Sequence, residues 1–299
     1  MKAFLALLFA ASSALSQWQS IGNVTGYEKT VNGIIVSAPP TKVILSVLGA
    51  DVVRIRASKD GAFLPDSSWA VITHSIKQAK FQVDENEKFL LLTLEAGFVR
   101  IQKSPCRISF YTSQGNLINS DDSLRGMSWS GDENIVWKAM PPDEHYFGLG
   151  EKASSTMDRR GKMFTNWNTD IPAYKADTDP LYETLPFFYG VHKGTAYGIF
   201  YDNTYYSHFD MGKEDQGAYS FGATGGEMNY YFFFGPEPAT IMRNLASLTG
   251  SMPLPPRWAL GYQQCRWSYY PESRVREIAS TFRSKKIPCD VIYLDIHYM

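Results

Sequence analysis

Trp267 and Asp295 stand 28 residues apart near the end of the chain, and each directly follows a run that is typical of a β-strand. These two runs, 258–265 and 290–294, flank a helical segment, which is the pattern of two parallel strands joined by a crossover helix. Neighbouring parallel strands end at the same rim, where barrel active sites are built. A carboxylate at that rim can accept hydrogen bonds from two adjacent sugar hydroxyls, and an indole can cover the apolar face of the same ring. The residue types therefore favour a sugar-binding rim.

A structural interpretation of these two residues stays open. Many barrel strands end on a polar residue that is simply solvated, and the indole of Trp267 could serve packing alone. The residue types by themselves do not decide between binding and packing.

The segment between the two runs predicts an amphipathic helix over 271–286. Its apolar residues between 275 and 282 repeat at the spacing of one helical face, which would pack on the sheet, and Pro288 ends the helix. A (β/α)8 barrel needs about 250 residues to close. Since only a first βαβ unit follows the proline connector, we expect this chain to be the front part of a longer protein, with the remainder of the barrel beyond Met299.

Residues 17 to about 235 are typical of an antiparallel β-sandwich. Apolar and polar residues alternate over 53–57 and over 106–111, which predicts strands with one buried face. An unbroken aromatic run at 230–234 predicts a strand that is buried on both faces. Turn residues separate the strands at 59–61, 114–116 and 225–226. Many short strands with turns between them favour a sandwich.

The hydrophobic period changes near residue 238. Ile241, Leu245 and Leu248 fall on one face of a predicted helix over 238–249, and Gly250 suits its C-terminal cap. Three prolines between 253 and 256 then form a stiff connector. The predicted domain boundaries are therefore a leader at 1–16, a sandwich domain at 17–250 and the opening of a barrel at 251–299.

The first 16 residues predict a secretory signal peptide. A basic start precedes an almost wholly apolar run, and Ala14-Leu15-Ser16 fits a cleavage site. The apolar run is too short to span a membrane, and no later run approaches about 18 apolar residues. We therefore expect a secreted or periplasmic protein without a membrane span.

The charged residues favour neither nucleic acid nor a nucleotide cofactor as a partner. The formal net charge is −1, which gives no attraction to nucleic acid. A small basic cluster has no interleaved aromatic residues, so we interpret it as solvated surface; it comprises Lys152, Arg159, Arg160 and Lys162. Residues 148–153 match the dinucleotide pattern G-x-G-x-x-A, but no apolar helical face follows them.

The cysteines indicate neither a disulfide framework nor a zinc site. Cys106, Cys265 and Cys289 are too few for the first, and neither they nor the histidines have metal-ligand spacing. We expect Cys265 and Cys289 to be buried free thiols, because each lies within or beside a predicted strand. No metal and no cofactor is expected.

Several stretches form a series of motifs in a fixed order. They are 146–152 (Tyr-Phe-Gly-Leu-Gly-Glu-Lys), 166–170 (Asn-Trp-Asn-Thr-Asp), 185–189 (Leu-Pro-Phe-Phe-Tyr), 235–238 (Gly-Pro-Glu-Pro), 261–269 (Gly-Tyr-Gln-Gln-Cys-Arg-Trp-Ser-Tyr) and 288–299 (Pro-Cys-Asp-Val-Ile-Tyr-Leu-Asp-Ile-His-Tyr-Met). The last two resemble the opening of the catalytic barrel of glycoside hydrolase family 31, the α-glucosidase and α-xylosidase family. The first resembles that family's signature in its N-terminal sandwich, and the second resembles the sandwich loop that reaches over the active site. The resemblance covers residues from about 40 to 299.

The resemblance implies a mainly β fold, with a galactose-mutarotase-like antiparallel β-sandwich followed by the first βαβ unit of a (β/α)8 barrel. It implies that Asp295 binds hydroxyls of the sugar in the −1 subsite, with Ile296 beside it and Trp267 lining the same subsite. Asp170 would contribute from the sandwich loop, nearer the leaving group. His297 departs from the family pattern, since many members carry a second Asp there, and a supporting role for this histidine is favoured over one in catalysis.

The resemblance also implies a retaining mechanism, in which one Asp attacks the anomeric carbon and a second protonates the leaving oxygen. Neither of these two acids is found in this chain; both are expected beyond Met299, so the 299 residues alone are expected to be inactive. The implied activity is that of an exo-acting, α-glucosidase-like glycoside hydrolase on terminal α-linked sugars of oligosaccharides. α-Xylosidase, α-galactosidase and transglucosylase activities stay open. The alternative from another class is a non-catalytic carbohydrate-binding β-sandwich protein.

Overall fold

The computed structural model describes residues 18–72 and 79–299. The predicted signal peptide at 1–16 lies outside the described residues. Contacts between residues divide the chain into two compact units, one that ends at Gly250 and one from Ser251 to Met299. Among the residues described, no helix is long and apolar enough to cross a membrane.

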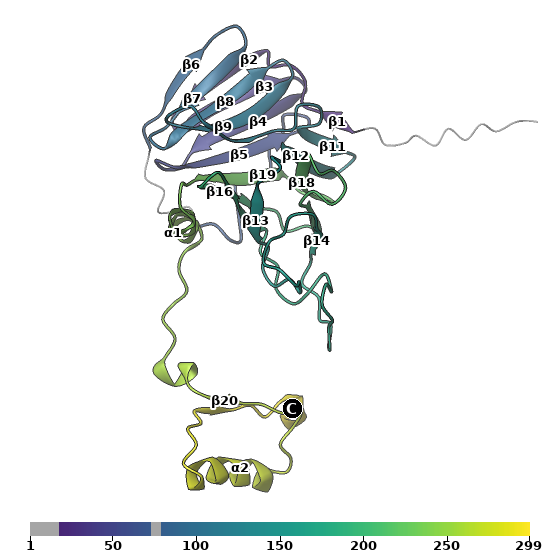
Figure 1. Ribbon diagram of the computed structural model, residues 1–299, viewed down its shortest axis with the longest axis vertical. Coiled ribbons are helices and arrows are strands. Elements are labelled where there is room, and N and C mark those ends of the chain that lie inside the picture. Colours follow the sequence, from purple (N-terminus) through teal and green to yellow (C-terminus); the bar gives the residue numbers. More distant parts are fainter. Residues whose placement is uncertain (1–17, 73–78) are drawn as a thin grey trace, which may run out of the picture. The chain divides into compact units, whose positions relative to one another are not determined.

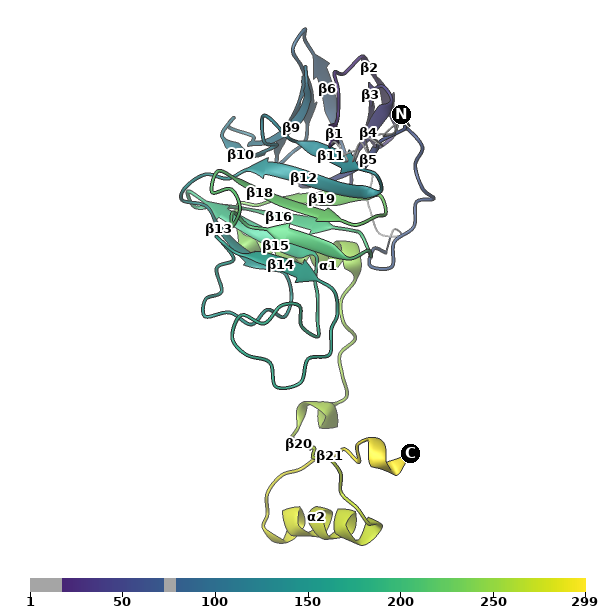
Figure 2. The same ribbon diagram turned by 90° about the vertical axis from the view of Figure 1, so that its right-hand side faces the viewer.

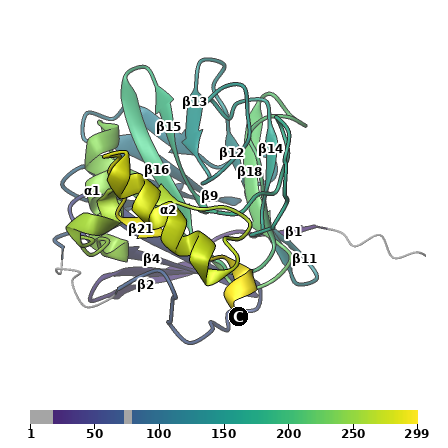
Figure 3. The ribbon, with the colours of Figure 1, turned by 90° about the horizontal axis from the view of Figure 1, so that it is seen from below.

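The first unit is an antiparallel sandwich whose largest layer is an eight-stranded sheet (Figure 1). In spatial order its strands are β13 (His145–Gly148), β15 (Phe187–His192), β16 (Thr195–Tyr201), β19 (Met228–Phe234), β5 (Val52–Ser58), β4 (Thr41–Val47), β3 (Gly33–Ala38) and β2 (Gly26–Thr30). Figures 2 and 3 show β13, β15 and β16 side by side at one end of this sheet. That end carries two of the family motifs, because residues 146–152 begin in β13 and residues 185–189 lead into β15.

Two smaller antiparallel sheets complete the sandwich. One has the order β1 (Gln19–Ser20), β11 (Met127–Ser130), β12 (Glu133–Ala139), β18 (Ala218–Ala223), β17 (Ser207–Asp210) and β14 (Met163–Asn166). The other has the order β10 (Leu117–Ser120), β9 (Cys106–Thr112), β8 (Gly97–Lys103), β7 (Phe89–Thr93) and β6 (Gln82–Glu85). All three sheets contribute to one hydrophobic core, in which Phe110 of β9 stacks on Phe232 of β19 with ring centroids 3.7 Å apart.

Strand β19 confirms the prediction from the aromatic run. Every residue of β19 is buried, because its alternate side chains enter different cores. Tyr230, Phe232 and Phe234 belong to the sandwich core, whereas Tyr231 and Phe233 belong to a second cluster on the opposite face of the sheet.

Helix α1 (Pro238–Thr249) covers that second face (Figure 1). Its bounds coincide with the predicted helix, and Gly250 follows it with φ of 85°, a conformation that suits glycine. Ile241 and Leu248 are buried in the second cluster, with Leu245 partly buried beside them. The helical stripe in the sequence is therefore the face that packs on the sheet.

The polar face of β5 is buried, whereas the sequence predicted that it would be exposed. Strand β5 was expected to be half-buried, but Arg54 and Arg56 are each only 8% exposed. The Arg54 guanidinium lies 2.8 Å from Asp66, and the Arg56 guanidinium donates to the Glu227 carboxylate at 2.8 Å. These distant carboxylates cover and neutralise the arginines, which is the condition for burying a charge.

The second unit contains the predicted parallel strand pair with its crossover helix. Strand β20 (Gln263–Gln264) pairs in parallel with β21 (Val291–Ile292), and α2 (Glu272–Ser284) connects them. The Phe282 ring of α2 packs against Tyr262, with centroids 5.8 Å apart, on the face that the periodicity predicts.

Both predicted strands of this unit are shorter than expected. Residues Arg257–Leu260 form a 3-10 helix, η2, rather than the first half of a strand. The ladder between β20 and β21 is two residues long on each side, and a strand continues only where a partner supplies backbone hydrogen bonds. The prediction for Cys265 is also wrong, because this thiol is exposed in its unit, whereas Cys106 and Cys289 are buried.

Candidate functional site

Asp295 occupies a constrained position between β21 and the short helix that follows it. Its backbone has φ of 64° and ψ of −174°, a region that costs a non-glycine residue about 1–3 kcal/mol. Its side chain accepts a hydrogen bond from the Ile296 backbone N–H at 2.6 Å and so caps the 3-10 helix η3 (Ile296–Tyr298). The local turn therefore fixes the direction of the carboxylate.

Trp267 lies beside the turn that carries Asp295. The rings of Trp267 and His297 meet edge to face, with centroids 5.7 Å apart. His297 Nδ1 is 2.6 Å from the Ser268 hydroxyl, which makes a second link between the segments that follow β20 and β21. Trp267 is 71% exposed, so its indole has a free face. The structure thus brings together two segments that are about 28 residues apart in sequence.

The remaining predicted site residues lie in different surroundings. Ile296 begins η3 and is 54% exposed. Asp170 belongs to the sandwich unit, in the segment after β14, and is exposed. Asp170 acts electrostatically on Tyr182. The pKa of Tyr182 is raised first by desolvation and then by the negative charge of Asp170.

The loop that holds Asp170 is anchored by a buried lysine. Lys152 Nζ lies 2.8 Å from Asp179 Oδ1 and donates to the Thr165 carbonyl at 2.5 Å, and the other Asp179 oxygen accepts the Thr165 N–H at 2.5 Å. Burial lowers the pKa of Lys152, against the opposing effect of Asp179. These contacts tie Asp179, within the loop, to Thr165 of β14.

The basic cluster around Lys152 is therefore not the solvated surface that the sequence suggested. The Lys152 ammonium is fully covered, and the neighbouring arginines are only partly exposed. Arg159 donates to the Gly148 carbonyl at 3.1 Å, and Arg160 donates to the Glu144 carbonyl at 2.8 Å. The prediction failed because the acceptors are backbone carbonyls and a distant aspartate, which no local pattern of charge reveals.

Residues 146–152 form a tight turn that packs against β15. Leu149 is buried and has φ of 71°, between Gly148 and Gly150, which also have positive φ. A Cβ on Gly148 would lie 2.5 Å from the Phe187 carbonyl oxygen, so the turn must approach β15 without a side chain. The glycines are thus explained by this close approach.

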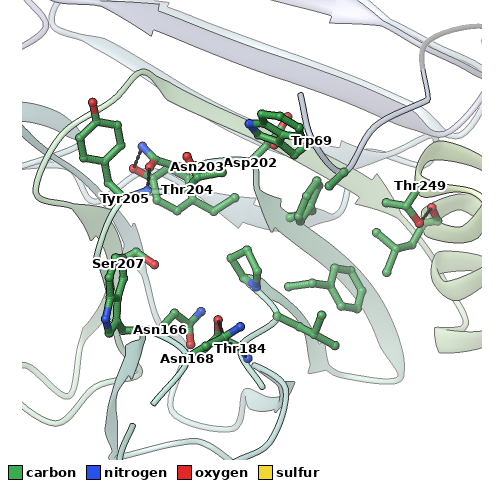
Figure 4. Close-up of a pocket in the computed structure, with 18 of the residues that line it drawn as sticks. Trp69, Asn166, Asn168, Thr184, Asp202, Asn203, Thr204, Tyr205, Ser207 and Thr249 are labelled. Atoms are coloured by element: carbon green, nitrogen blue, oxygen red, sulfur yellow. Dashed lines mark hydrogen bonds between the residues drawn. The ribbon is translucent and has the colours of Figure 1, made fainter. Parts of the chain in front are cut away.

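A pocket of about 910 Å³ opens on the sandwich unit beside this loop (Figure 4). Its wall includes Asn166, Trp167 and Asn168 from the second motif, together with Trp69 and Tyr205. In the sequence this motif pointed only to Asp170, which does not line the pocket, and the pocket itself was not predicted. The available signal was the pair of amides on either side of an indole.

The described ranges, 18–72 and 79–299, contain no group of three or more His, Cys, Asp or Glu side chains that could hold a metal ion.

Family comparisons match both units. The family model described as the glycosyl hydrolase 31 N-terminal galactose mutarotase-like domain matches residues 42–210, more than half of the chain. The model of the glycosyl hydrolases family 31 TIM-barrel domain matches residues 252–299. The chain belongs to glycoside hydrolase family 31. The resemblance drawn from the motifs, and the mainly β fold that it implied, are confirmed.

Individual relatives of this family 31 chain differ in their activities. It is 40% identical over 281 residues to alpha-glucosidase 2 of Bacillus thermoamyloliquefaciens, covering 93% of this chain and 35% of that protein. It is 26% identical over 299 residues to the isomaltosyltransferase of Sporosarcina globispora, covering 93% and 26%. Among solved structures, a mutant of the Flavobacterium johnsoniae GH31 dextranase complexed with isomaltotriose has a TM-score of 0.88 and 39% identity, with 94% of this chain and 34% of that chain covered. The chain spans about a third of the length of these relatives or less.

Proposed function

We propose that this chain forms the sandwich and the barrel opening of an exo-acting, retaining α-glycoside hydrolase that is α-glucosidase-like and removes terminal α-linked sugars from oligosaccharides. The observation that carries the proposal is the 40% identity to an alpha-glucosidase, which extends over 93% of this chain. Two unrelated segments of the fold, the sandwich and the βαβ unit, are both included in that match.

In this proposal the −1 sugar is held by Asp295, Ile296 and Trp267, and Asp170 contributes from the sandwich loop. The contact between Trp267 and His297 supports the first part, because it places an exposed indole next to the turn that directs the Asp295 carboxylate. The nucleophile and the acid are proposed to lie in later barrel strands beyond Met299, about 5–5.5 Å apart as retention requires. The protein is proposed to be exported, by virtue of residues 1–16.

A second substrate class has specific support. The dextranase structure that is 39% identical to this chain was solved with isomaltotriose, and another relative is an isomaltosyltransferase. The second candidate is therefore an enzyme that prefers isomaltose-type over maltose-type linkages. Transfer to a second sugar is the alternative to hydrolysis.

The decisive experiment uses the open reading frame that encodes these residues, expressed through to its stop codon. Aryl α-glucoside, α-xyloside and α-galactoside, maltose and isomaltose are supplied, and the anomer released first is identified by NMR. We expect α-glucoside cleavage with the α-anomer first. Release of the β-anomer would contradict retention, and sugar binding without any cleavage would favour the non-catalytic carbohydrate-binding alternative.

A further inference from the structure

The sandwich pocket contains a buried amide whose hydrogen-bonding groups have no partner. Asn166, at the end of β14, is only 5% exposed, and in the described part of the chain neither its Nδ2 nor its Oδ1 has a hydrogen-bond partner. By contrast, the buried Asn134 accepts from the Tyr201 hydroxyl at 2.6 Å and donates to the Gly225 carbonyl at 3.3 Å. An unpaired buried polar group is expensive, so a site that keeps one calls for an external partner.

The chemistry of that amide restricts the partner. An asparagine side chain presents a donor and an acceptor side by side, and a ligand that satisfies both must also donate and accept. Carboxylates and fully ionised phosphates only accept. Adjacent sugar hydroxyls do both.

The charged residues of the pocket also favour a neutral ligand such as a sugar. No lysine, arginine or histidine lies among the residues that line it, so nothing there would balance an anionic ligand. The carboxyl that lines it, Asp202, is engaged by the Ser68 hydroxyl at 2.9 Å and by the Asn229 amide at 3.2 Å. A neutral ligand fits this wall better than a charged one.

Aromatic side chains supply the apolar part of the site. Trp167 follows Asn166 directly and is 50% exposed, and Figure 4 shows Trp69, which is 96% exposed, across the pocket from Asn166. The Tyr205 ring packs closely on Gly225, because a Cβ on this glycine would lie 2.8 Å from the ring. Flat rings beside a few amides and hydroxyls are suited to a sugar, which has an apolar face and a polar edge.

We propose that this pocket binds a neutral oligosaccharide, with the Asn166 amide exchanging hydrogen bonds with sugar hydroxyls and with Trp167 and Trp69 covering sugar rings. Each of the two amide atoms has less than 1 Å² of exposed surface, so binding requires a neighbouring side chain to shift; Trp167, the next residue along the chain, is 50% exposed. The site lies wholly within the sandwich unit and does not depend on the proposed activity.

The test is calorimetric titration of the 299-residue chain with maltotriose and with isomaltotriose. We expect saturable binding of at least one trisaccharide, weakened about tenfold or more by Asn166→Leu and by Trp69→Ala. Trp18→Ala is the matched control, because Trp18 is 45% exposed and lines none of the described pockets. This control should bind within about twofold of the unchanged chain.

A melting curve separates a binding role of Asn166 from a structural one. Asn166→Leu removes an unpaired polar group, so its Tm should equal or exceed that of the unchanged chain. If Asn166→Leu fails to fold, the proposal of an unpaired amide is overturned, and the fully exposed Trp69→Ala still tests the site. Absence of saturable binding, or unchanged affinity in both variants, overturns the proposal as well. Binding that is lost in Asp295→Ala but kept in Asn166→Leu would assign the sugar to the proposed −1 subsite instead.

Discussion

At the scale of single residues, the sandwich core contains a carboxyl, Glu144, whose burial outweighs the opposing charge of nearby Arg160. Glu144 is fully buried; one of its oxygens accepts from the Tyr146 hydroxyl at 2.7 Å, and the other has no partner among the described residues. Desolvation raises its pKa from 4.5 to about 7, with the Tyr146 and Tyr197 hydroxyls opposing the shift. Nearby Tyr197 and Tyr219 are also buried, their hydroxyl oxygens 3.1 Å apart.

The Glu144 shift predicts how stability depends on pH. The folded state keeps the proton up to a pH of about 7, while the unfolded state releases it near 4.5, so stability is highest below that value and falls as pH rises toward 7. The loss is at most roughly 3 kcal/mol. Glu144→Gln should remove this dependence and make the protein more stable at pH 8. Urea unfolding of both proteins at pH 5 and pH 8 measures it, and equal slopes with pH would refute the assignment.

Asp295 carries the prediction for activity. In the full-length protein, Asp295→Ala should lower kcat/KM on an aryl α-glucoside between about ten- and a hundredfold, because a charged hydrogen bond contributes about 1.5–3 kcal/mol. Asp295→Asn should be milder, since the amide keeps an acceptor. Trp267→Ala should weaken binding through lost stacking area.

A melting curve is the control for Asp295→Ala, and unchanged activity is the result that would contradict a binding role. A retained melting transition shows that the loss of activity is not a loss of fold. Near-unchanged kcat/KM in a folded Asp295→Ala protein would mean that the carboxylate is only the solvated cap of η3.

At the scale of elements, α1 rests directly on the backbone of β16. A Cβ on Gly198 would lie 2.6 Å from Ile241 Cγ2, so the glycine makes room for the helix. Ile241 has no exposed surface, and the next residue, Met242, is 48% exposed. The helix is therefore held by one narrow stripe of side chains rather than by its whole surface.

This geometry predicts unequal effects of two adjacent truncations. Ile241→Ala should destabilise the protein by about 2–5 kcal/mol, because it leaves a cavity between helix and sheet. Met242→Ala should cost less than about 1 kcal/mol, since half of its side chain is already in solvent. Chemical denaturation followed by circular dichroism compares them. Similar midpoints for the two variants would show that the helix is not packed as described.

At the scale of the whole molecule, the two units differ in how much they bury. The sandwich has a continuous core shared by three sheets, whereas α2 has no buried residue and the parallel pair β20–β21 is two residues long. Between them lies a segment with prolines at 253, 255 and 256 that forms no helix or strand. Segments with few buried contacts open most readily.

Limited proteolysis of the 299-residue chain should therefore remove its end first. We expect cleavage near the proline segment and a stable product that ends close to Gly250, identified by mass spectrometry. Strands β20 and β21, with few partners, should not protect the residues after it. Residues 257–299 that resist protease as firmly as the sandwich would contradict this expectation.

Local patterns in the sequence were sufficient for the elements and for the family. The alternation at 53–57 and 106–111 located β5 and β9, although most of their polar side chains are buried too, and the apolar stripe at 241–248 located α1 together with the face that it buries. The ordered motifs identified glycoside hydrolase family 31. The roles proposed for Asp295, Ile296, Trp267 and Asp170 remain predictions.

Only the tertiary structure decided which polar groups are buried and what satisfies them. Arg56 is covered because Glu227 lies 171 residues away in sequence, and Lys152 is covered because Asp179 is 27 residues away. The sequence around Asn166 and Glu144 does not distinguish them from polar residues that find partners, yet in the described part of the fold polar atoms of each stay unpaired. Composition and periodicity determine which elements form; burial of a charge or an amide depends on partners brought in from distant segments, and that information exists only once the chain has folded.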